Sequence, residues 1–371
     1  MPNDITNPIS RRKFVQTTAA TTAVALAAPA IVTAKKTDGP LIVGTGEHKY
    51  EVHHAWPQLP AQFTWQTTHN VAIDSEGLLY VIHEGRADQK DHPSIFVFDS
   101  EGKYIRSFGS EFQGGGHGIE VRNEGGQDFL YVAAYQAVRS IAKLDLQGER
   151  VWRQGAPMQA GGYAEGEEKI SHDKPSWGRD RFMPTNFAFA PDGGFYLADG
   201  YGSYRIHRYD KDAKWQSVFG SAGKGDGEFN LPHGVWIDDR QDGEPTVVVS
   251  DRANARLQWF TQAGKHLRTQ DGFMLPANND VLGDLMVVPD LVSRVTLLDK
   301  NNKVVAQLGD DHRRIQADKE EHNSFHIRAD ESTWQPGKFI HPHDACFDPN
   351  GNIFVAEWVQ NGRVTKLQKL S

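Results

Sequence analysis

The sequence predicts an all-β protein folded as a six-bladed β-propeller, and three observations lead to this prediction. A unit of strands with alternating apolar and polar residues, bounded by Gly, Asp or Asn turns, recurs six times along the chain. A spacing of about 40 to 50 residues with several short strands per unit is typical of propeller blades. The 36 glycines and the 10% aromatic content suit a β protein that is rich in turns.

Each copy of the unit opens with one position, here called the slot, that follows a turn and begins the first strand. In chain order the slot residues are His69, His117, Thr185, His233, Ala277 and His343. In the first copy an Asp-Ser-Glu-Gly turn and two further strands, at 79–82 and 95–98, follow the slot strand. The copy at 275–299 is degenerate. Because the innermost strand of a propeller blade lines the central channel, we expect the slot residues to face that channel.

The two ends of the chain predict how the ring closes. The sixth copy stops at Ser371 without an outer strand, whereas residues 40–43 and 50–52 precede the first copy and have no unit of their own. We therefore expect the N-terminal segment to add a strand to the last blade, which closes the ring and removes exposed sheet edges.

Two spacings between copies are long, at residues 158–179 and 310–337. Both are polar and lack a clear strand pattern, so we expect loops over one mouth of the ring. Long loops in a compact domain are often functional, although solvated insertions would give the same pattern.

The N-terminus indicates a targeting segment. SRRKFV at residues 10–15 is a twin-arginine pattern, and a small, apolar, uncharged run follows it at residues 17–34. We expect residues 1–34 to be a signal peptide and residues 35–371 to be one domain, exported by the twin-arginine translocase to the periplasm or the outside. A membrane anchor is the alternative, but the run is only weakly hydrophobic.

Composition limits the partners of the mature chain. The net charge is −8 and no basic block follows the N-terminus, which argues against nucleic acid and anionic membranes as partners. The single cysteine, Cys346, excludes an intrachain disulfide and zinc sites with several cysteines. We expect a small-molecule or peptide substrate instead.

Histidines occupy the slot in alternate copies, which predicts a metal site. If the ring has six blades, His117, His233 and His343 lie roughly 120° apart around the axis. Three imidazoles converging in this way would bind zinc and leave a coordination position open for water or substrate. The alternative is that each imidazole bonds to the backbone of a neighbouring blade. His69 has the same slot but breaks the alternation, so it could be a fourth ligand, a partner that orients a ligand, or a substrate contact.

Two further residues are candidates for chemistry because they follow second strands near the same mouth. Tyr201 beside a divalent cation could lose its proton and act as a base. Arg252 could hold a carboxylate through two parallel hydrogen bonds. A structural alternative, in which the arginine pairs with acidic residues across blades, remains open.

Several motifs together resemble a known family. They are DGYGSYR at 199–205, FNLPH at 229–233, DRANARLQ at 251–258 and PHD at 342–344. The repeats resemble NHL-type propellers, and these motifs resemble the peptidyl-α-hydroxyglycine α-amidating lyases. The resemblance implies a six-bladed propeller that cleaves the C–N bond of a carbinolamide to give an amide and glyoxylate. It also implies catalytic zinc on His117, His233 and His343, a structural calcium with Asp344 as a ligand, Tyr201 as the catalytic tyrosine and Arg252 as an active-site arginine.

The sequence departs from the family pattern in two places. Gly116 stands where the family has Pro before the first zinc histidine, and Glu84 rather than an arginine follows His83. Arg86 lies two residues further on and is a candidate substrate contact. Two other functions remain open: a non-enzymatic NHL propeller that binds a protein or glycan, and a lactonase-like hydrolase with calcium on acidic and Asn ligands, for which Asn70, Asn186 and Asn278 are candidates.

Overall fold

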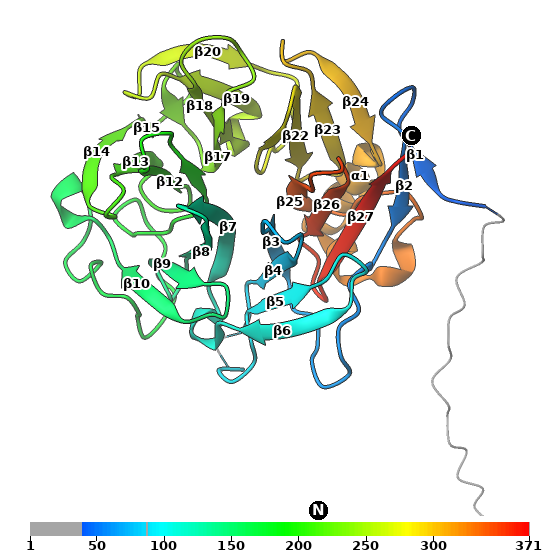
Figure 1. The fold of residues 1–371 in the computed structure, drawn as a ribbon, viewed down its shortest axis with the longest axis horizontal. Helices are drawn as coiled ribbons and strands as arrows, with labels where there is room; N and C mark the ends of the chain where they lie inside the picture. The colour runs from blue at the N-terminus through cyan, green and yellow to red at the C-terminus, as the bar shows by residue number, and fades with distance from the viewer. Residues whose placement is uncertain (1–38, 87, 371) are drawn as a thin grey trace, which may run out of the picture. The chain divides into compact units, whose positions relative to one another are not determined.

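Six antiparallel sheets are arranged as blades around a central axis (Figure 1). The computed structural model of the protein describes residues 39–86 and 88–370, so the expected signal peptide at 1–34 lies outside the described residues. Five blades have four strands and the last has five. The predicted all-β six-bladed fold is confirmed.

The blades follow one another along the chain, and each begins at the axis. Blade 1 comprises β3 (Thr68–Ile73), β4 (Leu79–His83), β5 (Ile95–Phe98) and β6 (Tyr104–Phe108). Blade 2 comprises β7 (Gly116–Glu124), β8 (Gln127–Ala134), β9 (Ser140–Asp145) and β10 (Arg150–Gln154). Blade 3 comprises β11 (Phe187–Phe189), β12 (Phe195–Asp199), β13 (Arg205–Tyr209) and β14 (Trp215–Phe219).

The second half of the ring repeats this plan. Blade 4 comprises β17 (Pro232–Asp238), β18 (Thr246–Asp251), β19 (Arg256–Phe260) and β20 (His266–Gln270), after a small parallel pair, β15 (Ser221–Ala222) and β16 (Glu228–Phe229). Blade 5, the degenerate copy, comprises β21 (Asp280–Leu282), β22 (Leu285–Asp290), β23 (Arg294–Leu298) and β24 (Val304–Leu308). Blade 6 contains β25 (Pro342–Phe347), β26 (Ile353–Glu357) and β27 (Arg363–Lys369).

The outer strands of blade 6 come from the other end of the chain. β2 (Tyr50–His53) pairs antiparallel with β27, with Tyr50 opposite Lys369, and β1 (Ile42–Val43) pairs with β2. The blue β2 and the red β27 lie side by side in Figure 1. The outer edge of β27 is therefore paired with strand rather than open.

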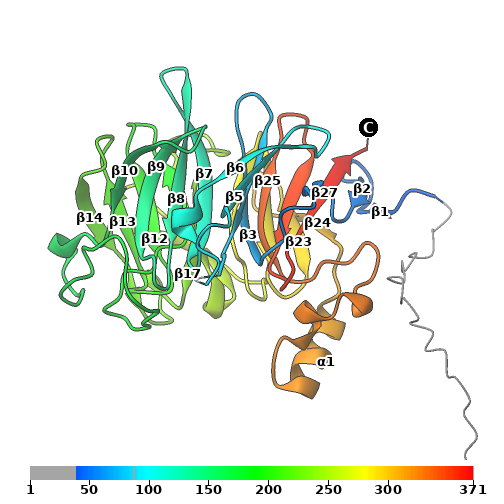
Figure 2. The same cartoon turned by 90° about the horizontal axis from the view of Figure 1, so that it is seen from below.

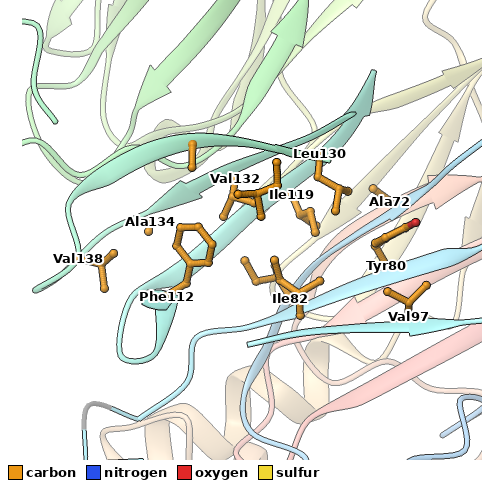
Figure 3. Packing of buried hydrophobic residues seen from close by; sticks show 13 residues of the cluster. Ala72, Tyr80, Ile82, Val97, Phe112, Ile119, Leu130, Val132, Ala134 and Val138 are labelled. Carbon is orange, nitrogen blue, oxygen red and sulfur yellow. The ribbon is translucent and has the colours of Figure 1, made fainter. Parts of the chain in front are cut away.

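The core lies between adjacent blades. Between blades 1 and 2, the buried side chains of Tyr80, Ile82 and Val97 pack against Ile119 and Leu130 (Figure 3). Successive side chains of a strand point to opposite faces, and every residue of β4 and β5 is buried, so both faces of blade 1 pack against other parts of the protein. This packing holds the six inner strands around the channel.

The long segment 310–337 contains a helix that the strand pattern did not predict. α1 (His312–His322) is followed by short 3-10 helices at His326–Ala329 and Glu331–Thr333, and α1 projects from one side of the ring in Figure 2. The sequence of α1 has almost no apolar periodicity, and Ile315 is the one buried residue of this helix. The segment 158–179 contains one short 3-10 helix, Met158–Ala160. In the described ranges, no helix is long and apolar enough to cross a membrane.

Candidate metal centre and substrate pocket

In each blade that has a slot histidine, a β-bulge lies at that histidine. The pairing of the inner strand with the second strand shifts register across Gly116/Gly118 in blade 2, and the same shift flanks His69, His233 and His343 in their blades. A bulged residue has no partner in the ladder, and its side chain is re-aimed. The bulges, which the sequence patterns did not reveal, therefore turn these four imidazoles into the channel.

Three of the histidines bond to the next blade in the same way. Nδ1 of His117 donates to the carbonyl oxygen of Thr185 at 3.0 Å, and Nδ1 of His233 donates to that of Ala277 at 2.7 Å. Nδ1 of His343 donates to the carbonyl oxygen of His69 at 2.7 Å. Since a carbonyl oxygen can only accept, the proton of each neutral imidazole sits on Nδ1 and the Nε2 atom carries a lone pair.

Close approach between blades explains the glycine after two of these histidines. A Cβ atom at Gly118 would lie 2.2 Å from the carbonyl oxygen of Thr185, the acceptor for His117. A Cβ atom at Gly234 would lie 2.5 Å from Cα of Asn278. The glycines thus allow the neighbouring backbone to come near enough to orient the imidazoles.

The rings of the three histidines lie close together, and the Nε2 atoms of two of them face each other. Nε2 of His117 lies 3.0 Å from Nε2 of His233, and the ring of His343 lies 5.0 Å and 4.6 Å from those two rings. Two lone pairs at this distance repel unless a proton or cation lies between them. Nε2 of His343 is buried without a hydrogen-bond partner. Burial, the largest cause, lowers the pKa of all three histidines well below the usual value. Clustered neutral imidazoles are ligands that zinc accepts, so this donor set fits the metal.

His69 lies in the same cluster but is held differently. Its ring is 4.8 Å from that of His117 and 4.6 Å from that of His343. Its Nε2 atom lies 2.9 Å from Oε2 of Glu84, while its Nδ1 atom is buried and has no partner. One nitrogen each from His69, His117 and His343 lie within 4.8 Å of one another, so His69 belongs to a possible ligand set. The cluster therefore holds four histidines, of which one is paired with a carboxylate.

Tyr201 and Arg252 lie directly beside the histidines. The Tyr201 ring is 5.4 Å from that of His117 and 5.5 Å from that of His233, and Nη1 of Arg252 donates to the Tyr201 hydroxyl at 3.1 Å. Burial raises the pKa of Tyr201, and the positive charge of Arg252 opposes this shift. Nε and Nη2 of Arg252 are buried without partners. Asp251, the acidic neighbour, pairs with Arg256 instead, so the structural alternative does not describe Arg252.

A pocket of about 820 Å³ opens beside this cluster, and both long segments contribute to it. Tyr201 and Tyr135 stack in its wall, with ring centroids 5.1 Å apart, and Trp177 packs edge-on against both. Trp177 comes from the first long segment and Arg328 from the second. The remaining lining residues are Gln66, Thr67, Glu84, Gly85, Arg86, Gln136, Ala329, Trp358 and Gln360. The volume is in the range of sites for small ligands.

Arg86, the candidate substrate contact, lies at this pocket but is exposed. Its backbone N–H donates to Oε1 of Gln113 at 2.7 Å. Sequence reasoning did not single out Tyr135, Trp177 or Arg328. The aromatic residue Tyr135 stood at the end of a second strand, which was the only signal available, whereas Trp177 and Arg328 lie in segments without a strand pattern.

Asp344 belongs to a second buried cluster that also lines the channel. Asp344, Asp280 and Glu120 line a separate pocket of about 120 Å³. Burial raises the pKa of both aspartates to about 7 and that of Glu120 well above its usual value. Asp344 accepts hydrogen bonds from Nδ2 of Asn278 at 2.6 Å and from the backbone N–H of Val71 at 2.9 Å.

The amide groups around this second cluster supply further oxygens. The Oδ1 atoms of Asn70, Asn186 and Asn278 are buried and have no hydrogen-bond partner. Carboxylate and amide oxygens are ligands that calcium accepts, and a bound cation would offset the cost of burying the carboxylates. The donor set thus fits calcium. The family resemblance pointed to Asp344, and no sequence pattern singled out Glu120 or Asp280.

Comparisons with known proteins agree with this architecture. No protein-family model matches the chain. NHL repeat-containing protein 3 of Homo sapiens is 26% identical over 217 residues, which are 57% of this chain and 56% of that protein. A probable peptidyl-alpha-hydroxyglycine alpha-amidating lyase of Caenorhabditis elegans is 26% identical over 174 residues, or 46% of this chain and 44% of that one. The chain spans about half the length of the curated relatives that it matches.

Solved structures share the fold at low sequence identity. A gluconolactonase from Xanthomonas campestris has a TM-score of 0.55 and 13% identity, and covers 89% of this chain and 95% of its own. A catalytically inactive virginiamycin B lyase from Staphylococcus aureus, solved with quinupristin, has a TM-score of 0.52 and 11% identity, and covers 86% of this chain and 100% of its own.

Fold and site together define a six-bladed propeller with a buried histidine cluster on its axis. The chain resembles NHL-repeat proteins and, at 26% identity, an amidating lyase. Distant homology to that lyase supports an enzyme on a propeller scaffold.

Proposed function

We propose that the protein is an exported, zinc-dependent carbon–nitrogen lyase of the amidating-lyase type. Its substrate would be an α-hydroxyglycine-like carbinolamide, and the products an amide and glyoxylate. The observation that carries this proposal is the shared geometry of His117, His233 and His343. Each Nδ1 atom is bonded to the next blade, Nε2 of His117 faces Nε2 of His233, and the ring of His343 lies within 5.0 Å of both rings.

His117, His233 and His343 would hold the zinc ion, with His69 beside them. Bound zinc would supply Lewis-acid polarisation of the substrate's oxygen. The chain's own residues prepare this site without the ion, because the three Nδ1 hydrogen bonds fix the imidazole orientations and burial keeps the rings neutral.

Tyr201 would transfer the proton of the reaction, and the positive charge of Arg252 would favour the deprotonated form of Tyr201. The Arg252 guanidinium donates to the Tyr201 hydroxyl and favours its deprotonated form, against the effect of burial. Deprotonated Tyr201 would take the proton of the carbinolamide hydroxyl as the C–O bond becomes a carbonyl and the C–N bond breaks. The same proton would then pass to the amide nitrogen, so that glyoxylate and a neutral amide leave.

Asp344 would bind a structural calcium ion with the oxygens around it. The buried carboxylates of Glu120 and Asp280 and the unpartnered amide oxygens support this role. A cation here would link inner strands of several blades, because Asp344 lies on β25 and Glu120 on β7. Its contribution would be to stability and not to the reaction.

Export by the twin-arginine translocase is part of the proposal and rests on residues 10–34 alone. The periplasm or the outside of the cell would be the working location. Fusion of residues 1–40 to a reporter that is active only after export tests this point. Retention of signal after Arg11 and Arg12 are both changed to Lys would contradict it.

The residues that line the two pockets argue against a lactonase-like function. Such a site would place Asn and acidic calcium ligands where the substrate binds. Here Asn278, Asp344 and Glu120 line the 120 Å³ pocket, and none of them lines the 820 Å³ pocket. A protein- or glycan-binding propeller would have no need for four buried histidines on the axis.

Metal analysis of the purified protein, together with a glyoxylate assay on α-hydroxyhippurate, tests the proposed function. We expect about one zinc per chain, and activity that chelation removes and zinc restores. Stoichiometric zinc without glyoxylate formation would reject the lyase, and activity that is indifferent to chelation would reject the metal.

A further inference from the structure

Arg328 lines the pocket with a charged side chain whose hydrogen-bonding groups are not all used. Its Nε atom is buried and without a hydrogen-bond partner, and within the described ranges no carboxylate forms an ion pair with its guanidinium. Burial lowers the pKa of Arg328, and the charge of Glu84 opposes this shift. Both Glu84 oxygens are already engaged, one 2.9 Å from His69 and the other accepting from Gln136 at 2.7 Å.

The chain holds Arg328 rigidly at the pocket wall. Its guanidinium carbon lies 3.2 Å from the centre of the Trp358 ring, and its carbonyl oxygen accepts from the backbone N–H of Gln360 at 3.0 Å. The preceding residue, Ile327, is buried, and its N–H donates to Asp318 at 2.9 Å. An arginine stacked on an aromatic ring keeps its donor edge free and loses little freedom on binding.

The rest of the pocket defines what such an arginine would bind. Tyr135, Tyr201 and Trp177 form an aromatic wall, and Arg328 and Trp358 line the same pocket. A guanidinium matches a carboxylate through two parallel hydrogen bonds. The volume of about 820 Å³ suits a small ligand rather than a folded partner.

We propose that Arg328 is a specificity-determining residue that binds the carboxylate of a small substrate, whose aromatic or apolar part packs on Tyr135 and Trp177. The segment 310–337 is therefore a substrate-recognition element, not a passive insertion. This inference rests on the proposed function only in taking the 820 Å³ pocket as the substrate site.

Calorimetric binding of two probes to the zinc-loaded full chain tests the proposal. Hippurate carries a carboxylate and a benzoyl group, whereas benzamide carries the ring and amide without the carboxylate. We expect wild type to prefer hippurate, and Arg328→Gln to weaken hippurate binding by about 10- to 100-fold with benzamide binding unchanged. Arg328→Lys should recover part of the affinity, because the charge remains and the fork is lost.

Arg313→Gln is the matched control, since Arg313 lies exposed on α1 of the same segment. It removes the same charge and should bind both probes as wild type does. Unchanged benzamide binding by Arg328→Gln also shows that the pocket is still folded. Arg86→Gln, at the exposed edge, should weaken hippurate less than Arg328→Gln does.

Kinetics separate this proposal from the proposed function. With α-hydroxyhippurate, Arg328→Gln should raise KM by a similar factor and leave kcat within about threefold. Wild type that binds hippurate through Arg328 but forms no glyoxylate would reject the lyase and uphold the inference. Active wild type whose hippurate binding and KM do not depend on Arg328 would overturn the inference alone, as would a wild type that does not bind hippurate.

Discussion

The channel contains two buried clusters on the same inner strands, here called the histidine end and the carboxylate end. Burial shifts the pKa values of the two clusters in opposite directions. β7 carries His117 and Glu120, and β25 carries His343 and Asp344. Burial lowers the pKa of the histidines and raises that of the carboxyl groups, Asp344 to about 7. Burial thus favours the neutral form at both ends, but a neutral imidazole is ready to bind metal whereas a neutral carboxyl group must first lose its proton. Metal binding at the two ends should therefore differ in its pH dependence.

The largest expected effect comes from removing one histidine of the converging set. His233→Ala should reduce glyoxylate formation by more than about 100-fold, because it removes a ligand and leaves the His117 lone pair without its facing neighbour. Zinc content, measured on the same preparation, should fall with activity.

His207→Gln is the matched control for this change. His207 is equally buried but lies on β13, where it contacts Tyr163 and Trp215 rather than the channel. Zinc content should be unaffected. Full activity of His233→Ala would end the proposal that these histidines hold a catalytic metal.

Removing the hydroxyl of Tyr201 should separate chemistry from metal binding at the histidine end. Tyr201→Phe retains the ring that packs on His117 and His233 but loses the acceptor for Arg252. We expect kcat to fall by about 100-fold or more with zinc content unchanged. Tyr135→Phe, in the stacked neighbour, should have a smaller effect, and equal losses in both variants would show that Tyr201 has no special role.

The channel could be predicted from the sequence only in part. The period-2 strands and the slot positions identified six blades and brought His117, His233 and His343 to one place, because repeated units place equivalent residues equivalently. The two interpretations offered for these histidines are compatible, since Nδ1 of His117 bonds the next blade while its Nε2 atom faces His233.

What could not be predicted depends on partners that are distant along the chain. The bulge at His117 depends on the register of β7 against β8. The contact of His69 with Glu84 depends on the relative orientation of β3 and the end of β4. Arg328 reaches the pocket from a helical segment with almost no apolar pattern. Such contacts leave no local signal in sequence.

Calcium should sharpen the contrast at the carboxylate end. Calcium binding must displace the protons of Asp344 and its neighbours, so affinity should fall by about tenfold for each proton displaced as pH drops one unit below about 7. Thermal unfolding with and without calcium at about pH 8 and about pH 5.5 measures this, because the rise in Tm should be larger at the higher pH. The zinc end should bind with little change over this range.

Asp344→Asn provides the corresponding variant test. It keeps the acceptor for the N–H of Val71 but removes a charge, so the calcium-dependent rise in Tm should shrink while zinc content stays the same. An unchanged calcium response would remove Asp344 from the ligand set.

The smallest expected effect is on the pH dependence of stability when His207, a buried histidine outside the channel, is replaced. This effect is the reference for the influence of burial on the channel histidines. Burial lowers the pKa of His207 to about 3, below its ordinary value of about 6.5. The unfolded chain therefore takes up a proton that the folded chain does not, and stability is lost as pH falls from about 6.5 toward 3, by up to about 1.4 kcal/mol per pH unit. In urea unfolding between about pH 6 and about pH 4, His207→Gln should show a shallower loss of stability than wild type by about this slope. Parallel slopes would mean that His207 is already protonated in the folded protein, and burial alone could then not be the reason that the channel histidines are neutral.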